Sequence, residues 1–243
     1  MSEDKELWKV YTVKLQVLDK LYGGLPKDPN LIEGFLKGKG LSPAEAEARA
    51  KVIAPEIDQS IPEDEGQKAE GMWAGFKKDD KGLYIETRQI KAMLKESCGE
   101  SEMWKDKRKG FMSRLAGTVF PKGEGGVDLS RIYLYRDGKA LTRPDGFEEP
   151  ICDVGTPISQ PDGFEETVGH IKGPQGPRSI LKRADYVISP VIHFDLKVGG
   201  KAVSEKDLKY LFEFGQEVGL GAGRSQEKGK FQMLELKLKA AEK

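Results

Sequence analysis

The chain has 243 residues and a formal net charge of zero, with 40 Lys and Arg against 40 Asp and Glu. This balance excludes binding of a polyanion through overall charge, so any such site must come from local clusters. Two cysteines (Cys98, Cys152) and two histidines (His170, His193) are too few for a disulfide framework, and no CxxC or HExxH spacing points to zinc. We expect no metal and no other cofactor.

A reduced, cytoplasmic protein is expected from the same features. The start of the chain is polar and acidic, unlike a signal peptide. No apolar run approaches the roughly 20 residues that cross a bilayer, so a membrane role is not expected.

The first third of the chain predicts a strand followed by short helices. Apolar and polar residues alternate over 10–17, which is the period of a half-buried strand. One or two short helices are predicted over 31–54, with Ser42, Pro43 and Glu45 as a capped start. Residues 54–71 hold six acidic residues against one lysine, which indicates a solvated linker or insertion.

A second group of elements follows. Residues 83–85 predict a short extended piece, and helical spacing of apolar residues predicts a helix over about 86–97. Residues 131–136 predict a compact strand. The hexapeptide PDGFEE occurs at 144–149 and at 161–166, and its Pro-Asp-Gly indicates two matched turns of a hairpin-rich excursion.

The last third predicts a strand, a helix and a closing strand. Gly173, Pro174, Gly176 and Pro177 predict a loop at the tip of a basic segment. Residues 185–198 predict a strand kinked near Pro190. A helix over 205–218 begins at a capping box of Ser204 and Asp207. Its predicted apolar face consists of Leu208, Leu211, Phe212 and Gly215. Residues 230–239 alternate as a strand.

These regular elements run strand, helix, strand, strand, helix, strand. That order predicts an α+β, ferredoxin-like (βαββαβ) fold, in which two helices cover one face of a four-stranded antiparallel sheet. We expect a single domain over 1–243. Insertions are expected at 23–80 (helical and acidic), 99–130 and 137–185 (a protruding basic hairpin).

Glycines at alternate positions, Gly219, Gly221 and Gly223, precede Arg224 and Ser225 near the end of the chain. They follow a predicted helix and open a strand, which is the reverse of a dinucleotide-binding loop, and the Gly-Lys-Ser/Thr of a Walker loop is absent. A helix cap needs one glycine only. The pattern therefore predicts a loop with positive φ angles whose bare N–H groups, with Arg224, Ser225 and Lys228, face a phosphodiester backbone.

Positive charge is concentrated in three stretches, although simple solvated faces are the alternative. The stretches are 105–114, 172–183 and 224–230, and such segregation suits a groove that follows a phosphate backbone. The basic candidates in the first two are Lys105, Lys107, Arg108, Lys109, Arg114, Lys172, Arg178, Lys182 and Arg183. Candidates for base stacking are Tyr22, Trp73, Phe76 and Trp104, whereas Phe212 and Phe231 are expected in the core.

Three segments resemble the RAMP superfamily of CRISPR-associated proteins. Residues 219–237 resemble its glycine-rich loop, 82–97 are similar to the strand that leads into its first helix, and 170–198 resemble its long hairpin. The resemblance implies a ferredoxin-like fold, binding of CRISPR RNA and a thumb-like hairpin. It also implies that Arg88, Lys91 and Lys95 contact RNA.

Two classes of function compete within that superfamily. A backbone subunit holds guide RNA by its sugar-phosphate chain, whereas a repeat endoribonuclease needs a general acid or base near the scissile phosphate. His170 is the candidate for the second role, because His193 sits in a strand and is expected to be a sheet-face histidine. Asp28, Asp79 and Asp80 lie in predicted loops, but no pattern gives any of them a metal-dependent cleavage role.

A scaffold or assembly subunit, viral in origin or not, is the alternative outside nucleic acids. We favour a non-catalytic RNA-binding subunit. The expected partners are guide RNA, a DNA or RNA target, and copies of itself or other subunits of an effector complex.

Overall fold

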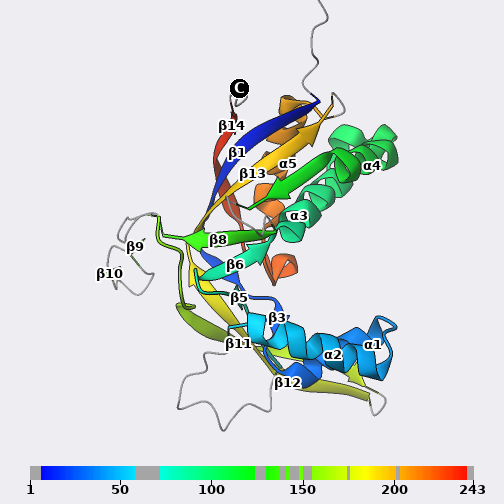
Figure 1. Cartoon of the computed structure of the whole chain (residues 1–243), viewed down its shortest axis with the longest axis vertical. Coiled ribbons are helices and arrows are strands. Elements are labelled where there is room, and N and C mark those ends of the chain that lie inside the picture. The colour runs from blue at the N-terminus through cyan, green and yellow to red at the C-terminus, as the bar shows by residue number, and fades with distance from the viewer. Residues whose placement is uncertain are drawn as a thin grey trace, which may run out of the picture. The chain divides into compact units, whose positions relative to one another are not determined.

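The computed structural model describes residues 7–58, 72–123, 130–136, 141–142, 148–149, 155–173, 176–200 and 203–239. The chain forms two compact units (Figure 1). Unit 1 comprises Met1–Leu21, Ile85–Thr156 and Ser189–Lys243, and unit 2 comprises Tyr22–Tyr84 and Pro157–Ile188. Strands β2 (Lys20–Tyr22) and β6 (Leu83–Glu86) lie where the chain passes from one unit to the other. The single-domain organisation stays a prediction, because compactness alone does not show whether either unit folds without the other.

Unit 1 has the ferredoxin-like arrangement that the sequence predicts. Strand β14 pairs with β1, β1 with β13, and β13 with β7 and β8, and all of these pairs are antiparallel. The ranges are β1 (Trp8–Val17), β7 (Val119–Lys122), β8 (Arg131–Tyr135), β13 (Val191–Gly199) and β14 (Phe231–Leu238). Helix α3 (Thr87–Glu100) follows β1 in the fold and α5 (Glu205–Val218) follows β13, which completes the split βαβ pattern.

The core of unit 1 lies between this sheet and its helices. Alternation along β1 buries Tyr11, Val13, Leu15 and Val17 on one face. The register places Val13 opposite Phe194 of β13, whose ring lies 6.3 Å from that of Phe212 in α5. Helix α5 therefore covers this face of the sheet, and its predicted apolar residues are all buried.

Helices α3 and α5 pack directly against each other. A side chain at Gly215 of α5 would overlap the sulfur of Met93 in α3, so glycine permits the close approach. The capping box at the start of α5 is present as predicted, because Ser204 accepts the Asp207 N–H and Asp207 accepts the Ser204 N–H.

The predicted insertion at 99–130 belongs in part to the main sheet. It contains η3 (Glu102–Lys107), α4 (Arg108–Thr118) and β7, which pairs with β13 through Val119 and Val198. Treating β7 as part of an insertion was wrong. Pro121 obscures the strand pattern, but proline is tolerated there because β7 lies at the edge of the sheet.

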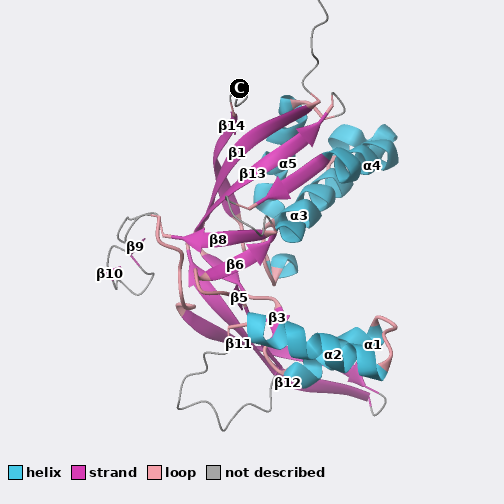
Figure 2. Cartoon of the chain, viewed as in Figure 1, coloured by secondary structure: helices cyan, strands magenta, loops and turns pink. Residues whose placement is uncertain are grey.

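Unit 2 is built on a five-stranded sheet, in which β2 also pairs with β12, and on two short helices (Figure 2). The sheet order is β11-β12-β4-β3, with β12 and β4 parallel. The ranges are β3 (Leu25–Pro26), β4 (Met72–Gly75), β11 (Gly163–Gly173) and β12 (Gly176–Ile188), and β5 (Lys77–Lys78) pairs with β6. Helices α1 (Pro29–Gly38) and α2 (Pro43–Ile53), followed by η1 (Ala54–Glu56), share a small core of Ile32, Ala50 and Ile57.

The two predicted short helices and the Ser42–Glu45 capping box are confirmed. Two other predictions around the hairpin need correction. The predicted strand over 185–198 is two strands, because Ser189 has a φ of 43° and β12 ends before it. The predicted loop at the hairpin tip is shorter than expected, since β11 and β12 run through Gly173, Gly176 and Pro177.

The two copies of PDGFEE behave differently. In the first copy, β10 (Glu148–Glu149) pairs with β9 (Leu141–Thr142), while residues 143–147 lie outside the described residues. In the second copy Asp162 forms no hairpin turn. Its carboxylate accepts the N–H of Ile188, which fixes the start of β11 beside the end of β12.

Candidate nucleic-acid interface

The glycine-rich loop (residues 219–229) joins α5 to β14 in unit 1. Gly219, Gly221, Gly223 and Gly229 have φ angles of 78°, 74°, 76° and 74°. Residues with a Cβ adopt this left-handed region at a cost, whereas glycine enters it freely. The predicted positive φ values are therefore confirmed.

Part of the glycine requirement comes from closure of the loop on itself. The Leu220 N–H donates to the Gly229 carbonyl at 2.9 Å, and the Leu220 side chain is buried. A Cβ at Gly229 would overlap the Leu220 carbonyl oxygen, and one at Gly219 would come within 2.7 Å of the Lys228 carbonyl. These two glycines bring the ends of the loop together.

The middle of the loop presents backbone donors. The N–H groups of Gln226, Glu227 and Lys228 donate to carbonyls within the loop. Within the described part of the chain, no acceptor takes the N–H groups of the run from Gly221 to Ser225. These residues are partly or fully exposed. Successive backbone N–H groups beside left-handed residues form an anion-binding concavity, so the loop has the geometry for phosphate oxygens.

Arg224 lies within this loop and is held by a residue that the sequence analysis missed. Its Nη1 donates to the Glu96 carboxylate of α3 at 2.6 Å. Ser225 is exposed, and Lys228 is half-buried with its aliphatic chain beside Gly223. The structure thus brings the predicted Arg224, Ser225 and Lys228 together. Glu96 carries no sequence signal for this role, because only the fold places α3 beside the loop.

The predicted basic residues of α3 are on its outer side. Arg88 and Lys95 are exposed, and Arg88 donates to Glu86 at 2.6 Å. Lys91 is half-buried with its ammonium 4.4 Å from the centre of the Phe120 ring. Burial, with the charge of Lys95 as the smaller cause, lowers the pKa of Lys91.

The cluster at 105–114 is distributed over η3 and α4. Lys105 forms an ion pair with Glu102 at 3.1 Å, and Arg108 is half-buried and donates to the Ser101 carbonyl at 3.3 Å. The guanidinium of Arg114 lies over the Phe111 ring, and Lys109 is exposed. The side chain of Lys107 lies outside the described residues.

The cluster at 172–183 lies on the β11–β12 hairpin, which belongs to unit 2. The basic residues of the loop, α3, η3 and α4 belong to unit 1. The register pairs His170 with Ser179 and Lys172 with Pro177, but the side chains of His170, Lys172 and Arg178 lie outside the described residues. Lys182 is half-buried. Arg183 is only 5% exposed, with its Nε 2.6 Å from Glu166 and its guanidinium over Trp73, so its charge is used within unit 2.

All of the predicted base-stacking residues, Tyr22, Trp73, Phe76 and Trp104, are buried. The prediction that they stack on bases was wrong in each case, because a buried ring offers no face to a base. Trp104 stacks on Phe111 at 4.3 Å instead, and Trp73 packs on Phe164 at 5.0 Å. His193 lies on β13 with its ring 5.8 Å from Tyr135, as expected for a sheet-face histidine. Phe212 and Phe231 are in the core, as predicted.

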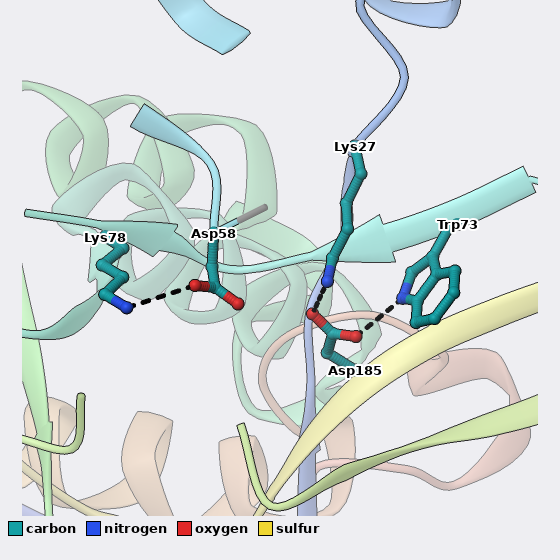
Figure 3. A network of polar contacts seen from close by, with 5 residues as sticks. All are labelled: Lys27, Asp58, Trp73, Lys78 and Asp185. Carbon is teal, nitrogen blue, oxygen red and sulfur yellow. Dashed lines mark hydrogen bonds and ion pairs between the residues drawn. The ribbon is translucent and has the colours of Figure 1, made fainter. Parts of the chain in front are cut away.

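Unit 2 contains a buried charged cluster that the sequence analysis did not predict (Figure 3). The carboxylate of Asp185 accepts the indole N–H of Trp73 at 2.7 Å and pairs with Lys27 at 2.7 Å, and the two charged side chains are 4% and 3% exposed. Burial raises the pKa of Asp185, although Lys27 and Trp73 counteract this increase. A second buried carboxylate, Asp58, pairs with Lys78 at 3.3 Å.

Two further properties concern metals and membranes. Within the described ranges, no three His, Cys, Asp or Glu side chains come together as ligands for a metal ion. None of the helices in those ranges combines the length and apolar character that a bilayer-crossing helix needs.

Comparison with known proteins gave likenesses to solved structures. No family model matches the chain, and no curated protein matches it. A solved structure with a similar chain is the cryo-EM structure of the Type III-B Cmr-beta bound to cognate target RNA. The identity is 11%, the TM-score is 0.44, and the match covers 95% of this chain. The chain spans 60% of the length of that chain.

Proposed function

We propose that this chain is a non-catalytic, cytoplasmic RNA-binding subunit of the RAMP type. In this proposal it holds CRISPR guide RNA by the sugar-phosphate backbone within an effector complex, beside copies of itself or other subunits. The glycine-rich loop is the contact that carries the proposal.

The decisive observation is the run of backbone N–H groups from Gly221 to Ser225 with no acceptor in the described part of the chain. Main-chain donors read phosphate oxygens and not bases, so they suit a ligand held without regard to sequence. Arg224, Ser225 and Lys228 add charge and a hydroxyl at the same place. A single carboxylate could accept hydrogen bonds from the loop only. A phosphodiester chain carries several phosphates, so one phosphate can bind the loop and the next ones the lysines and arginine of α3.

The fold supports the same assignment. The loop lies between the second helix and the last strand of a split βαβ unit, which is where the sequence resemblance to the RAMP superfamily places its glycine-rich loop. We leave Arg183 out of the proposed contacts, because it is buried and paired with Glu166. Arg88, Lys91, Lys95, Lys105, Lys107, Arg108, Lys109, Arg114, Lys172, Arg178 and Lys182 stay in the proposal as secondary contacts.

The test is a comparison of salt-dependent RNA binding. The double variant Arg224→Ala/Lys228→Ala should bind unrelated RNA sequences about ten-fold or more weakly, with a shallower dependence of affinity on salt, because each lost phosphate contact reduces that slope by about 1. Lys206→Ala is the matched control, since Lys206 is an exposed lysine on α5 outside the loop. Equal affinity of the double variant and the control would overturn the proposal.

Two further measurements concern identity and catalysis. The protein purified without nuclease should carry RNA, and sequencing this RNA identifies the guide. Incubation with CRISPR-repeat RNA in EDTA should leave the RNA intact. Cleavage that His170→Ala abolishes would replace the holder assignment with a metal-independent endoribonuclease.

A further inference from the structure

The end of the sheet where β1 begins carries an aromatic and basic cluster in unit 1. Trp8 of β1 is paired with Gly199 of β13, and Phe120 of β7 is paired with Lys197. Their neighbours in sequence on β7 and β13, Val119 and Val198, are buried. Because side chains alternate across a strand, Trp8 and Lys197 lie on the face opposite α5. Phe120, on the edge strand β7, also contacts Lys91 of α3.

The two rings and two lysines are in direct contact. The Trp8 and Phe120 rings are 5.9 Å apart at an angle of 63°. The Lys197 ammonium lies 4.4 Å from the Trp8 ring, and Lys91 lies at the same distance from the Phe120 ring. We call these four residues the sheet-end platform.

Gly199 gives Trp8 its position. A Cβ at Gly199 would come within 2.6 Å of the Trp8 ring, so the indole lies against the bare backbone of β13. Trp8 is nevertheless 38% exposed, whereas Trp73 and Trp104 are buried. The sheet thus supports one side of an indole ring and leaves part of it open to solvent.

No acidic side chain among the described residues pairs with the two lysines of the platform. Across the described segments, neither Lys91 nor Lys197 forms an ion pair. The acidic residue nearest in register, Asp195, is paired with Lys239 at 2.7 Å. An anion that docks beside Lys91 and Lys197 therefore meets two cations for which the described segments supply no carboxylate partner.

We propose that the sheet-end platform binds one nucleotide of a single-stranded RNA. The base stacks on Trp8, and Lys197, whose four-carbon stem is flexible, moves from the ring to the adjacent phosphate. An exposed ring with unpaired cations beside it fits a planar group joined to a phosphate, whereas an acidic peptide would use the cations only.

RNA as the ligand rests on the proposed function, but the platform itself shares no residue with the glycine-rich loop. Trp8 is the first residue of β1, while Val17 at its other end pairs with Phe231, two residues after the loop. A strand of this length spans about 30 Å, so the two sites are separate contacts. The platform adds to the affinity of the glycine-rich loop only for an RNA that is long enough to reach both sites.

Tryptophan fluorescence of the full chain tests the platform. An oligouridylate of about 16 nucleotides should quench the emission, and Trp8→Phe should remove most of this quenching because the other tryptophans are buried. Trp8→Ala and Lys197→Ala should each weaken binding roughly five-fold. Gly199→Ala keeps the indole but displaces it, and should reproduce the Trp8→Ala effect.

Two controls give the test its specificity. Lys9 is next to Trp8 in sequence, but its side chain lies on the other face of the sheet. Lys9→Ala therefore removes a nearby charge and should leave RNA affinity unchanged. An abasic oligonucleotide of the same length keeps the phosphates but cannot stack. It should bind the wild type and Trp8→Ala equally well.

The outcomes separate the platform from the loop. Unchanged affinity and quenching in Trp8→Ala and Lys197→Ala, with weakened binding in Arg224→Ala/Lys228→Ala, would overturn the platform and leave the proposed function standing. Residual quenching at saturating RNA in the loop variant supports the platform as an independent site. Quenching by an acidic peptide but not by RNA would overturn the nucleotide assignment.

Discussion

Basic residues of the two units differ in what surrounds them. In the glycine-rich loop of unit 1, Arg224 is partly exposed and sits among backbone N–H groups that have no acceptor in the described residues. In unit 2, Lys27 and Arg183 are buried and face Asp185 and Glu166. The same residue types are therefore left partly exposed in one place and are used for internal cohesion in the other. Burial and partners, rather than local charge density, decide between the two.

The largest expected effect comes from breaking the buried pair of unit 2. Lys27→Met leaves the Asp185 carboxylate buried without its cation and should lower the free energy of unfolding by about 3–5 kcal/mol. Lys37→Met breaks a surface pair with Glu33 and should cost less than about 1 kcal/mol. Urea denaturation measures both. If the two variants lose equal stability, the pair is not the internal support described above.

Loop closure should give the next largest effect. Gly229→Ala places a methyl group on the Leu220 carbonyl and should destabilise unit 1 by about 3 kcal/mol. Gly200→Ala is the matched control, because Gly200 also has a positive φ of 63° but no atom lies within 4 Å of its added Cβ. It should cost about 1 kcal/mol. Similar losses would mean that φ strain alone, and not closure, requires the glycine.

A smaller effect should appear in the pH dependence of stability. The pKa of Asp185 is raised in the folded state, so the folded chain holds this proton more tightly than the unfolded chain does. Protonated Asp185 therefore contributes to the free energy of unfolding. This contribution is fully present below the ordinary Asp pKa and is lost as pH rises through the raised pKa, by about 1.4 kcal/mol for each pKa unit of the shift. The stability of wild type minus that of Asp185→Asn should therefore fall from acid to neutral pH. A rise over this range would contradict the sign of the shift.

The smallest expected effect concerns Glu96. Its carboxylate pairs with Arg224 and, in the proposed complex, would compete with phosphate for the guanidinium, so Glu96→Gln should raise RNA affinity about two-fold. Glu100→Gln changes an exposed glutamate on the same helix and should have no comparable effect. Weaker RNA binding by Glu96→Gln would show instead that Glu96 orients the guanidinium.

Local patterns predicted the fold well. The alternation of β1, the capping box of Ser204 and Asp207 and the face of α5 depend on residues close in sequence, and the structure confirms them. Strand β7 was missed because Pro121 masks a short strand whose pairing partner, β13, is distant in sequence. The kink expected near Pro190 is a full break at Ser189, and this position was missed because a left-handed serine has no sequence signature.

The candidate site was predictable only in part. The glycine spacing indicated positive φ values, which depend on the absence of a Cβ and so can be inferred locally. The burial of Trp73 and Arg183 depends on Asp185 and Glu166, which are distant in sequence, and no local pattern reports such partners. Glu96 and the aromatic pair of Trp8 and Phe120 were missed for the same reason.

Unit 2 is assembled from two stretches, Tyr22–Tyr84 and Pro157–Ile188, and this connectivity limits how the protein can be shortened. Deleting the first stretch removes β4 and Lys27, which leaves β12 without its parallel neighbour and Asp185 without its cation. Deleting the second stretch removes Asp185, which leaves Lys27 and Trp73 without their buried acceptor. A shortened protein without unpaired buried charges must therefore lose both stretches together. The three remaining segments of unit 1 then need two new chain connections.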